Sequence, residues 1–243
     1  MPVIAVQGLR GGVGATSITA ALAWALQQLE ESVLVIDFSS DNLLRLHFNM
    51  PYEQANGWAR AAMDGNRWQQ QAMRYMPLLD FLPFGQLNMN EQRHLSGSLA
   101  SFDWQEKLAD LEAAGDHRWI LLDVPAGDSP LTQQALALAD HVLLLIAADA
   151  AIHARLHQQA LPVGCHFLLN QFSSASHLQQ DMHQLWLQSL RNLLPLFIHR
   201  DEAVAEALAA KQPLGEYAPQ SLAAEEINTL ANWCLIHGAE KNL

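Results

Sequence analysis

The stretch GLRGGVGATS, residues 8–17, follows the apolar run VIAVQ of residues 3–7 near the beginning of the chain. A buried strand, a glycine-rich turn and a helix that opens with Thr-Ser form the local order of a phosphate-binding loop. Successive backbone N–H groups surround the anion there, and glycines let the backbone come close to it. The common pattern G-x-x-x-x-G-K-[ST] requires a lysine where this chain has Ala15. The stretch therefore predicts a phosphate site without its lysine, a site that uses another residue, or a turn that binds nothing.

Apolar runs of strand length recur along the chain and alternate with longer helical patterns. Because the runs are continuously apolar, they are typical of parallel strands buried on both faces; they span residues 3–7, 32–37, 79–84, 119–125, 141–148, 165–170 and 194–199. Helical periodicity covers residues 15–30, with Leu29 on the apolar stripe, and residues 176–194 and 221–236. This order predicts an α/β fold with a doubly wound, mostly parallel sheet, helices on both faces and one domain over residues 1–243.

Residues 45–105 carry the weakest signals and are rich in Gln, Asn and Met. We expect the tryptophans of this region to lie in the core. Trp58 and the segment LNMNEQ, residues 87–92, are the alternative candidates for contact with a partner.

Composition excludes several classes of partner. The formal net charge is −12, and a surface of that sign repels nucleic-acid backbones and anionic lipids. The longest apolar stretch, residues 142–148, is far shorter than the roughly 20 residues of a spanning helix. Two cysteines without metal-ligand spacing are typical of a reducing compartment. We therefore expect a soluble cytoplasmic protein that does not bind nucleic acid and reaches a membrane only through partners.

Polar side chains stand at the ends of three predicted strands. Asp37, Asp123 and Asn170 occupy these positions, and ligands of open α/β sheets bind at the carboxyl ends of the strands. Magnesium prefers oxygen ligands and keeps several waters when it is bound to phosphates. We expect the Thr16 hydroxyl to bind Mg²⁺ directly, Asp37 and Asp123 to bind it through water, and Asn170 to contact a purine.

The order of these motifs resembles the MinD/ParA family of deviant-Walker P-loop ATPases. The family loop K-G-G-x-G-K-[ST] matches RGGVGAT of residues 10–16, and its switch I, D-x-D, corresponds to DFSSDN of residues 37–42. Its switch II, D-x-P-A-G, matches DVPAG of residues 123–127 in full. The non-lysine after RGGVG, and segments such as LPFGQL and LAAEEINTLANWC, are similar to the BcsQ branch of cellulose biosynthesis proteins.

The resemblance implies an ATP-dependent homodimer with nucleotide between the two copies. Arg10 takes the place of the lysine that reaches across the dimer, and it keeps the charge with bidentate geometry. Ala15 takes the place of the lysine that binds phosphates within one copy. The remaining phosphate contacts are then expected from the loop itself, namely Gly11, Gly12, Val13, Gly14, Ala15, Thr16 and Ser17.

The resemblance also implies that hydrolysis is very slow or absent. Ser39 stands where the family has the carboxylate that positions the attacking water, and phosphoryl transfer depends on positioning and electrostatics. Asp41 is the candidate to replace that carboxylate as a catalytic residue, and Asn42 is a weaker one. Whether the chain is an enzyme is therefore left open by the sequence.

Further residues take family roles by position. Pro125 belongs to the nucleotide-contacting switch II. Arg155, expected at the start of a helix, is assigned to dimer or nucleotide contacts, with a solvated helix residue as the alternative. Arg200 and Asp201 are expected to frame the adenine, with Asn170 at its edge.

In function, the resemblance implies a regulatory or assembly component of a membrane-bound cellulose synthase complex. Its implied partners are a second copy, a BcsR-like small protein, BcsE and synthase subunits, which would recruit it to the inner membrane. The alternative is a partition or positioning ATPase of the ParA/MinD type. The acidic charge and the weakly apolar residues 234–243 argue against that alternative, and a metabolic ATPase would need a second set of catalytic residues.

Two smaller patterns have simpler explanations. His153 and His157 have a metal-compatible spacing but no third ligand nearby in sequence. Ser129 is expected to cap a helix rather than act as a nucleophile.

Overall fold

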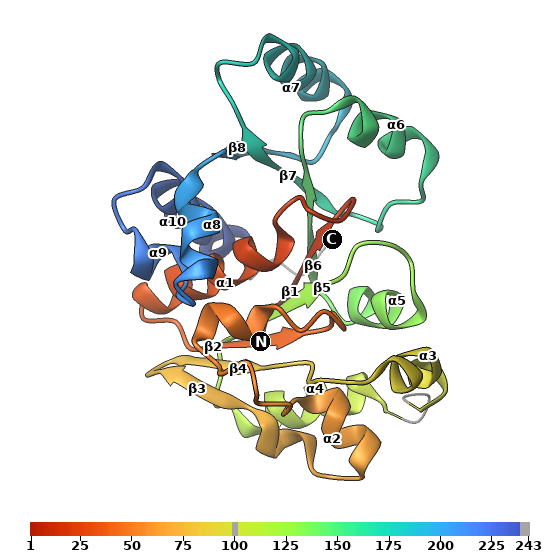
Figure 1. Cartoon of the computed structure of the whole chain (residues 1–243). Helices are drawn as coiled ribbons and strands as arrows, with labels where there is room; N and C mark the ends of the chain where they lie inside the picture. The colour runs from red at the N-terminus through yellow and green to blue at the C-terminus, as the bar shows by residue number, and fades with distance from the viewer. Residues whose placement is uncertain (99–101, 239–243) are drawn as a thin grey trace.

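The computed structural model describes residues 1–98 and 102–238, and its centre is an eight-stranded sheet with the order β3-β4-β2-β5-β1-β6-β7-β8 (Figure 1). All neighbouring strands pair in parallel except β3 and β4, which are antiparallel. The strands are β1 Val3–Gly8, β2 Val33–Asp37, β3 Met73–Met76, β4 Leu79–Leu82, β5 Trp119–Val124, β6 His141–Ile146, β7 His166–Phe172 and β8 Leu193–His199.

Helices flank this sheet, and Figure 1 shows α1, α8, α9 and α10 on one side of it and α5 and α6 on the other. Their bounds are α1 Ala15–Gln28, α2 Trp58–Asp64, α3 Met89–Ser98, α4 Trp104–Ala114, α5 Pro130–Ala137, α6 Ala150–Gln158, α7 His177–Ser189, α8 Glu202–Ala209, α9 Leu214–Tyr217 and α10 Leu222–His237. Two short 3-10 helices, η1 Leu44–Phe48 and η2 Trp68–Gln71, precede and follow α2. The predicted α/β fold with a mostly parallel sheet is confirmed.

The continuously apolar runs are the central strands. Every residue of β1, β2, β5 and β6 is buried, as expected for strands covered on both faces. The predicted boundaries differ from the observed ones at several ends. Residues 176–194 include a loop and the start of β8 as well as α7, and Leu29 is not on the buried stripe of α1 but caps the helix with 39% of its surface exposed. The edge strand β3 was missed because it is short and only half-buried.

The tryptophans of residues 45–105 pack around the end of β2. Trp58 on α2 and Trp104 on α4 are completely buried and meet edge to face, with ring centroids 4.8 Å apart. Phe38, which follows β2 directly, lies 4.9 Å from Trp104. The Trp58 indole donates a 2.7 Å hydrogen bond to the carbonyl oxygen of Asp37. The core interpretation of these tryptophans is confirmed, and the cluster fixes the backbone at the start of switch I.

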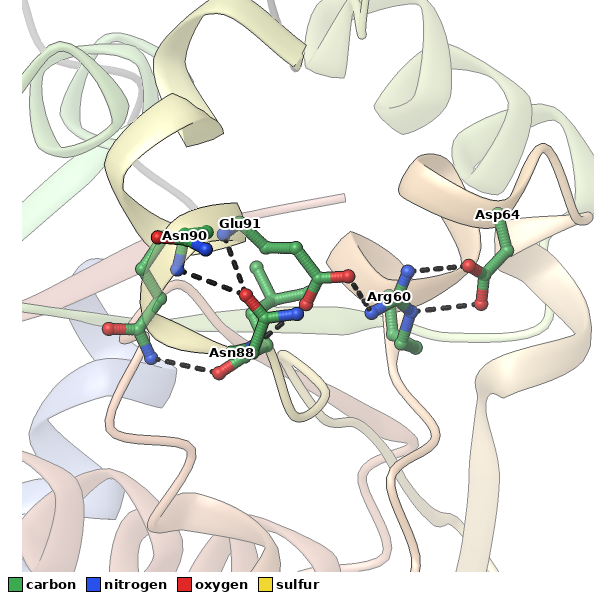
Figure 2. Close-up of polar contacts among 7 residues, drawn as sticks. Arg60, Asp64, Asn88, Asn90 and Glu91 are labelled. Carbon is green, nitrogen blue, oxygen red and sulfur yellow. Dashed lines mark hydrogen bonds and ion pairs between the residues drawn. The ribbon is translucent and has the colours of Figure 1, made fainter.

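The segment LNMNEQ caps α3 and joins it to α2. Figure 2 shows Arg60 of α2 between Asp64 on its own helix and Glu91 of α3, with the Arg60–Glu91 contact at 2.8 Å. The Asn88 side chain accepts 3.0 Å hydrogen bonds from the backbone N–H groups of Asn90 and Glu91, while Glu91 accepts one from the Asn88 N–H. This reciprocal arrangement is a capping box, so part of the segment has a structural explanation. Whether it also contacts a partner stays a prediction.

Arg45 holds the loop that follows switch I. Its guanidinium is buried and donates hydrogen bonds to the carbonyl oxygens of Asn42, Pro51 and Gln54 at 3.1, 2.9 and 2.9 Å. Because carbonyl groups compensate the buried charge by hydrogen bonding, the loop folds around this one side chain.

No helix among residues 1–98 and 102–238 is long and apolar enough to cross a membrane. The C-terminal segment that argues against a lipid-binding helix runs to residue 243, and its residues 239–243 lie outside the described part of the chain.

Burial of His47 in η1 predicts a pH-dependent loss of stability. Burial lowers the pKa of His47 to about 4, because a desolvated ring disfavours the charged form. Since the unfolded chain takes up a proton near pH 6.5 and the folded chain does not, stability falls as the pH drops from 6.5 toward 4. We expect His47→Gln to remove about 3 kcal/mol of this loss, measured by urea unfolding at a series of pH values. Equal slopes for the wild type and the variant would contradict the assignment.

Candidate functional site

A pocket of about 490 Å³ lies at the carboxyl ends of β1, β2 and β5. It is formed by the glycine loop, switch I and switch II, and its lining residues are Gly8, Arg10, Gly11, Gly12, Val13, Gly14, Ala15, Thr16, Ser17, Ser39, Asp41, Leu43, Asp123, Val124, Pro125 and Ala126. The structure therefore brings together the loop residues expected to contact phosphate with Thr16 and Asp123 of the expected magnesium site, whereas Asp37 lies outside the lining. Their roles as ligands stay predictions.

The glycine loop has the backbone shape of an anion cradle. Gly12 and Gly14 have φ angles of 82° and 89°, a left-handed conformation that side chains disfavour. A Cβ on Gly14 would lie 2.8 Å from the Asn170 amide nitrogen. Gly14 is also the N-cap of α1, and no side chain of the described residues caps that helix start. The first N–H groups of α1 are thus available to an anion, which the helix dipole favours.

Two carboxylates lie next to each other at this edge of the sheet, and of the two only Asp123 lines the pocket. Asp37 and Asp123 pair in register across β2 and β5, and both are buried. Burial, and then the Asp123 charge, raises the pKa of Asp37 well above its ordinary value. Burial also raises the pKa of Asp123 to about 7, while a hydrogen bond from the Thr16 side chain opposes this rise and the Asp41 charge adds to it.

These carboxylates are suited to a magnesium ion. The Oδ2 atoms of Asp37 and Asp123 are buried and have no hydrogen-bond partner among the described residues. Buried polar atoms are nearly always hydrogen-bonded or bound to an ion or water. Hard oxygen donors beside the Thr16 hydroxyl form the donor set that Mg²⁺ prefers. The chemistry of the residues present therefore fits the predicted metal.

Within switch I, only some of the candidate side chains face the pocket. Ser39 and Asp41 both line it, and Asp41 lies close enough to raise the pKa of Asp123. Asn42 is buried instead, and its side-chain oxygen accepts a 3.2 Å hydrogen bond from the Gly85 N–H. Asp41 is therefore better placed than Asn42 to act on a bound water.

Arg10 is the one cationic side chain among the residues that line the pocket. Its guanidinium forms a 2.7 Å ion pair with Asp149 and donates a 3.1 Å hydrogen bond to the Gly11 carbonyl. Asp149 is the N-cap of α6, and its other carboxylate oxygen accepts the Ile152 N–H. In the isolated chain, Arg10 is thus folded back along the rim of its own pocket.

Sequence reasoning missed the role of Gln7. This residue of β1 is 5% exposed, and its side-chain amide donates hydrogen bonds of 3.1 and 3.0 Å to the carbonyls of Pro125 and Gly127. It therefore fixes the turn of switch II beside Asp123. The available signal was a polar residue at the end of an otherwise apolar strand.

The amide of Asn170 points at the glycine loop. It donates a 2.8 Å hydrogen bond to the Val13 carbonyl, and the next residue, Gln171, donates a 3.0 Å bond to the Gly12 carbonyl. Neither residue lines the pocket of the isolated chain. The expected contact of Asn170 with a purine stays a prediction.

Of three further predicted residues, Arg155 lies elsewhere in its helix than expected, while the adenine contacts of Arg200 and Asp201 stay predictions. Arg155 lies in the last turn of α6 rather than at its start, and it is exposed outside the pocket lining. Asp201 caps α8, and its two oxygens accept hydrogen bonds from the N–H groups of Ala203 and Ala223 at 3.0 and 3.2 Å. The Arg200 side chain is exposed and lies outside the lining. Since Ala203 belongs to α8 and Ala223 to α10, Asp201 joins the starts of two helices, and each of its oxygens accepts one of these hydrogen bonds.

The smaller sequence patterns have structural explanations. Ser129 is the N-cap of α5 and accepts a 3.1 Å hydrogen bond from the Thr132 N–H, as predicted. His153 accepts a 3.2 Å hydrogen bond from the Trp186 indole.

Solved structures share this arrangement. The MinC:MinD cell division complex of Aquifex aeolicus superposes with a TM-score of 0.78 at 17% identity, over 100% of this chain and 98% of that chain. MinD of Pyrococcus horikoshii OT3, complexed with Mg-ADP, gives 0.71 at 19% identity over 99% of both chains. At these identities the likeness shows the fold alone, and it confirms the expected MinD/ParA-like architecture.

Sequence comparison is more specific. The cellulose biosynthesis protein BcsQ of Salmonella typhi is 54% identical over 246 residues, which cover 98% of this chain and 96% of that protein. The family model described as cellulose biosynthesis protein BcsQ matches residues 1–235. With this coverage and identity, the chain belongs to the BcsQ family.

Proposed function

We propose that the pocket binds Mg²⁺-ATP and that two copies of the chain close around the nucleotide. The observation that carries this proposal is the charge of the pocket. ATP is strongly anionic, whereas the lining offers Arg10 as its cation and the carboxylates of Asp41 and Asp123. Binding then requires Mg²⁺, and closing two copies around the nucleotide requires a further positive charge. Arg10 at the rim, supplied by a second copy, meets that need with bidentate phosphate geometry.

Hydrolysis in this proposal is slow or absent. Ala15 supplies no cation to the phosphates, and Ser39 supplies no carboxylate to orient a water. Asp41 is the remaining catalytic candidate, because it lines the pocket close to Asp123. ATP then serves mainly to hold the dimer together.

In the cell, the proposed role is a regulatory or assembly component of bacterial cellulose synthesis. Support comes from the relative's name and from the match of the family model over nearly the whole chain. The proposed partners are a second copy, a BcsR-like small protein, BcsE and the synthase subunits. They would bring a cytoplasmic protein of formal net charge −12 to the inner membrane.

Sedimentation velocity tests the proposal directly. The chain of 26.9 kDa is expected to double in mass when Mg²⁺-ATP is added, and to remain a monomer with ATP and a chelator. A mass that ATP leaves unchanged would reject the dimer, and calorimetry without a binding signal would reject the nucleotide site. Turnover at the roughly 1–10 s⁻¹ of an ordinary enzyme would reject slow hydrolysis.

The Arg10–Asp149 ion pair predicts a variant that dimerises more readily. Asp149→Asn keeps an oxygen for the Ile152 N–H but releases Arg10. Because a partly exposed ion pair is worth about 0.2–1 kcal/mol and the dimer contains two of them, we expect dimerisation with Mg²⁺-ATP to tighten roughly 2- to 30-fold. The measurement is a dilution series by sedimentation, with Asp128→Asn as the control for charge. A variant that dimerises no more tightly than this control would contradict the prediction.

A further inference from the structure

The carboxyl end of β7 contains an unusual residue. The pairing of β7 with β8 shifts register between Leu169 and Phe172, which marks an irregularity of the strand. Gln171, inside this irregularity, has a φ angle of 57°. A left-handed conformation is unfavourable for a residue with a long side chain. Such outliers and strand irregularities cluster near functional sites, where they redirect a side chain.

This conformation changes where the Gln171 side chain points. Successive residues of a regular strand point to opposite faces of the sheet, so Asn170 and Gln171 would not reach the same loop. Here both do, with amide nitrogens 2.8 Å from the Val13 carbonyl and 3.0 Å from the Gly12 carbonyl. The irregular backbone thus delivers two consecutive side-chain amides to two consecutive loop carbonyls.

Peptide geometry links these contacts to the cradle. In a trans peptide the C=O and the following N–H point in opposite directions. Holding the Gly12 carbonyl against β7 therefore directs the Val13 N–H away from β7, and holding the Val13 carbonyl does the same for Gly14. Since Ala15 provides no cation, N–H groups fixed in advance must contribute more to anion binding.

We propose that Gln171 is a positioning residue for the phosphate loop, and that its left-handed backbone serves to bring its amide to Gly12. This inference rests on the proposed nucleotide site, and it states that Gln171 orients the backbone N–H groups of that site. Gln171 does not itself touch the nucleotide. Its effect passes through the Gly12–Val13 peptide.

Two substitutions separate this role from a structural one. Gln171→Gly relieves the strain of the left-handed backbone and removes the side-chain amide. Gln171→Met keeps that strain and the side-chain length but removes the hydrogen-bond donor. We expect the affinity for Mg²⁺-ATP to fall about 3- to 10-fold in both, the range of one hydrogen bond. The melting temperature is expected to be unchanged or higher for the glycine variant and not higher for methionine. Affinity and stability then change independently, which a purely structural residue would not produce.

Glu30→Gly is the matched control. Like Gln171, Glu30 has a long side chain and a left-handed φ, here 61°, but it is exposed and follows the far end of α1. It is expected to gain stability as Gln171→Gly does and to keep the wild-type affinity. Titration calorimetry with Mg²⁺-ATP and thermal unfolding without nucleotide provide the two measurements.

Amide hydrogen exchange of the unliganded protein supplies a readout that does not depend on ATP. Residues Gly12 to Gly14 are expected to exchange faster in both Gln171 variants than in the wild type. Wild-type affinity and wild-type exchange in both variants would overturn the role of Gln171 while leaving the proposed function intact. A wild type that fails to bind Mg²⁺-ATP would instead overturn the proposed function, and faster exchange in the variants would still support the positioning of the loop.

Discussion

Replacing Arg10 with alanine is expected to abolish the ATP-dependent dimer while the chain still folds and still binds Mg²⁺-ATP. The Arg10 side chain is 36% exposed, and its polar contacts among the described residues are with Asp149 and Gly11, so its loss leaves no core cavity. In the dimer, however, it would lie between two copies as the cation facing phosphate. Truncating a desolvated charged hydrogen-bonding partner in an interface costs about 2–5 kcal/mol, and the dimer loses two of them, so we expect dimerisation to weaken by roughly a thousand-fold or more.

Sedimentation velocity over a dilution series with Mg²⁺-ATP measures this loss, and calorimetry measures the affinity of the monomer. Arg10→Lys is the matched variant, because it keeps the charge but loses the bidentate geometry. We expect its dimer to be intermediate between those of the wild type and Arg10→Ala. An alanine variant that dimerises as the wild type does would show that Arg10 has no role across the interface.

The central fold is predictable from the sequence because its strands carry their own signal. A strand covered on both faces must be apolar at every position, so runs such as 119–125 and 141–148 identify β5 and β6 directly. The edge strand β3 is only four residues long and none of its residues is fully buried, so its local pattern carries little information. Tertiary contacts decide the structure there.

The site is predictable where backbone chemistry dictates residue type. Glycine at position 14 is required by a left-handed φ and by the close approach of Asn170. Asp37 and Asp123 stand out because burying a carboxylate at the end of a strand costs free energy unless an ion or a hydrogen bond compensates it. The cap formed by Asp201 was not predicted, because an aspartate before a helix is equally consistent with a cap and with a ligand contact. Gln7 and Gln171 were missed because a polar residue near a strand end does not reveal its partner, here a backbone carbonyl of a distant loop.

The pair of buried carboxylates leads to a prediction in which stability and function change in opposite directions. Asp123 faces Asp37 across β2 and β5, and the Oδ2 atom of each has no hydrogen-bond partner among the described residues. Asp123→Asn removes one of the two like charges, and its new amide group can donate to Asp37. Replacing a member of a repelling buried pair relieves both desolvation and repulsion.

The sign of this effect follows from the shifted pKa. Burial raises the pKa of Asp123 to about 7, so the folded chain holds a proton that the unfolded chain releases near pH 4. Wild-type stability therefore decreases as the pH rises from about 4 to 7, and the decrease is complete above pH 7. At pH 8 without Mg²⁺, we expect Asp123→Asn to be more stable than the wild type by about 1–3 kcal/mol. Urea unfolding in the presence of a chelator measures this difference.

The same substitution is expected to lower the apparent affinity for Mg²⁺ in ATP binding by about 10- to 100-fold. This is the range for loss of a group that orients metal-bound water. A magnesium titration at fixed ATP measures this effect, and Asp128→Asn, a nearby exposed residue, is expected to leave stability and the titration unchanged. If Asp123 served only to stabilise the fold, its replacement would lower stability and leave the magnesium requirement unchanged. A gain in stability together with a loss of magnesium binding would instead identify a carboxylate whose unfavourable burial is compensated when the metal binds. Such a group destabilises the empty pocket, so its contribution is favourable only when the pocket is filled.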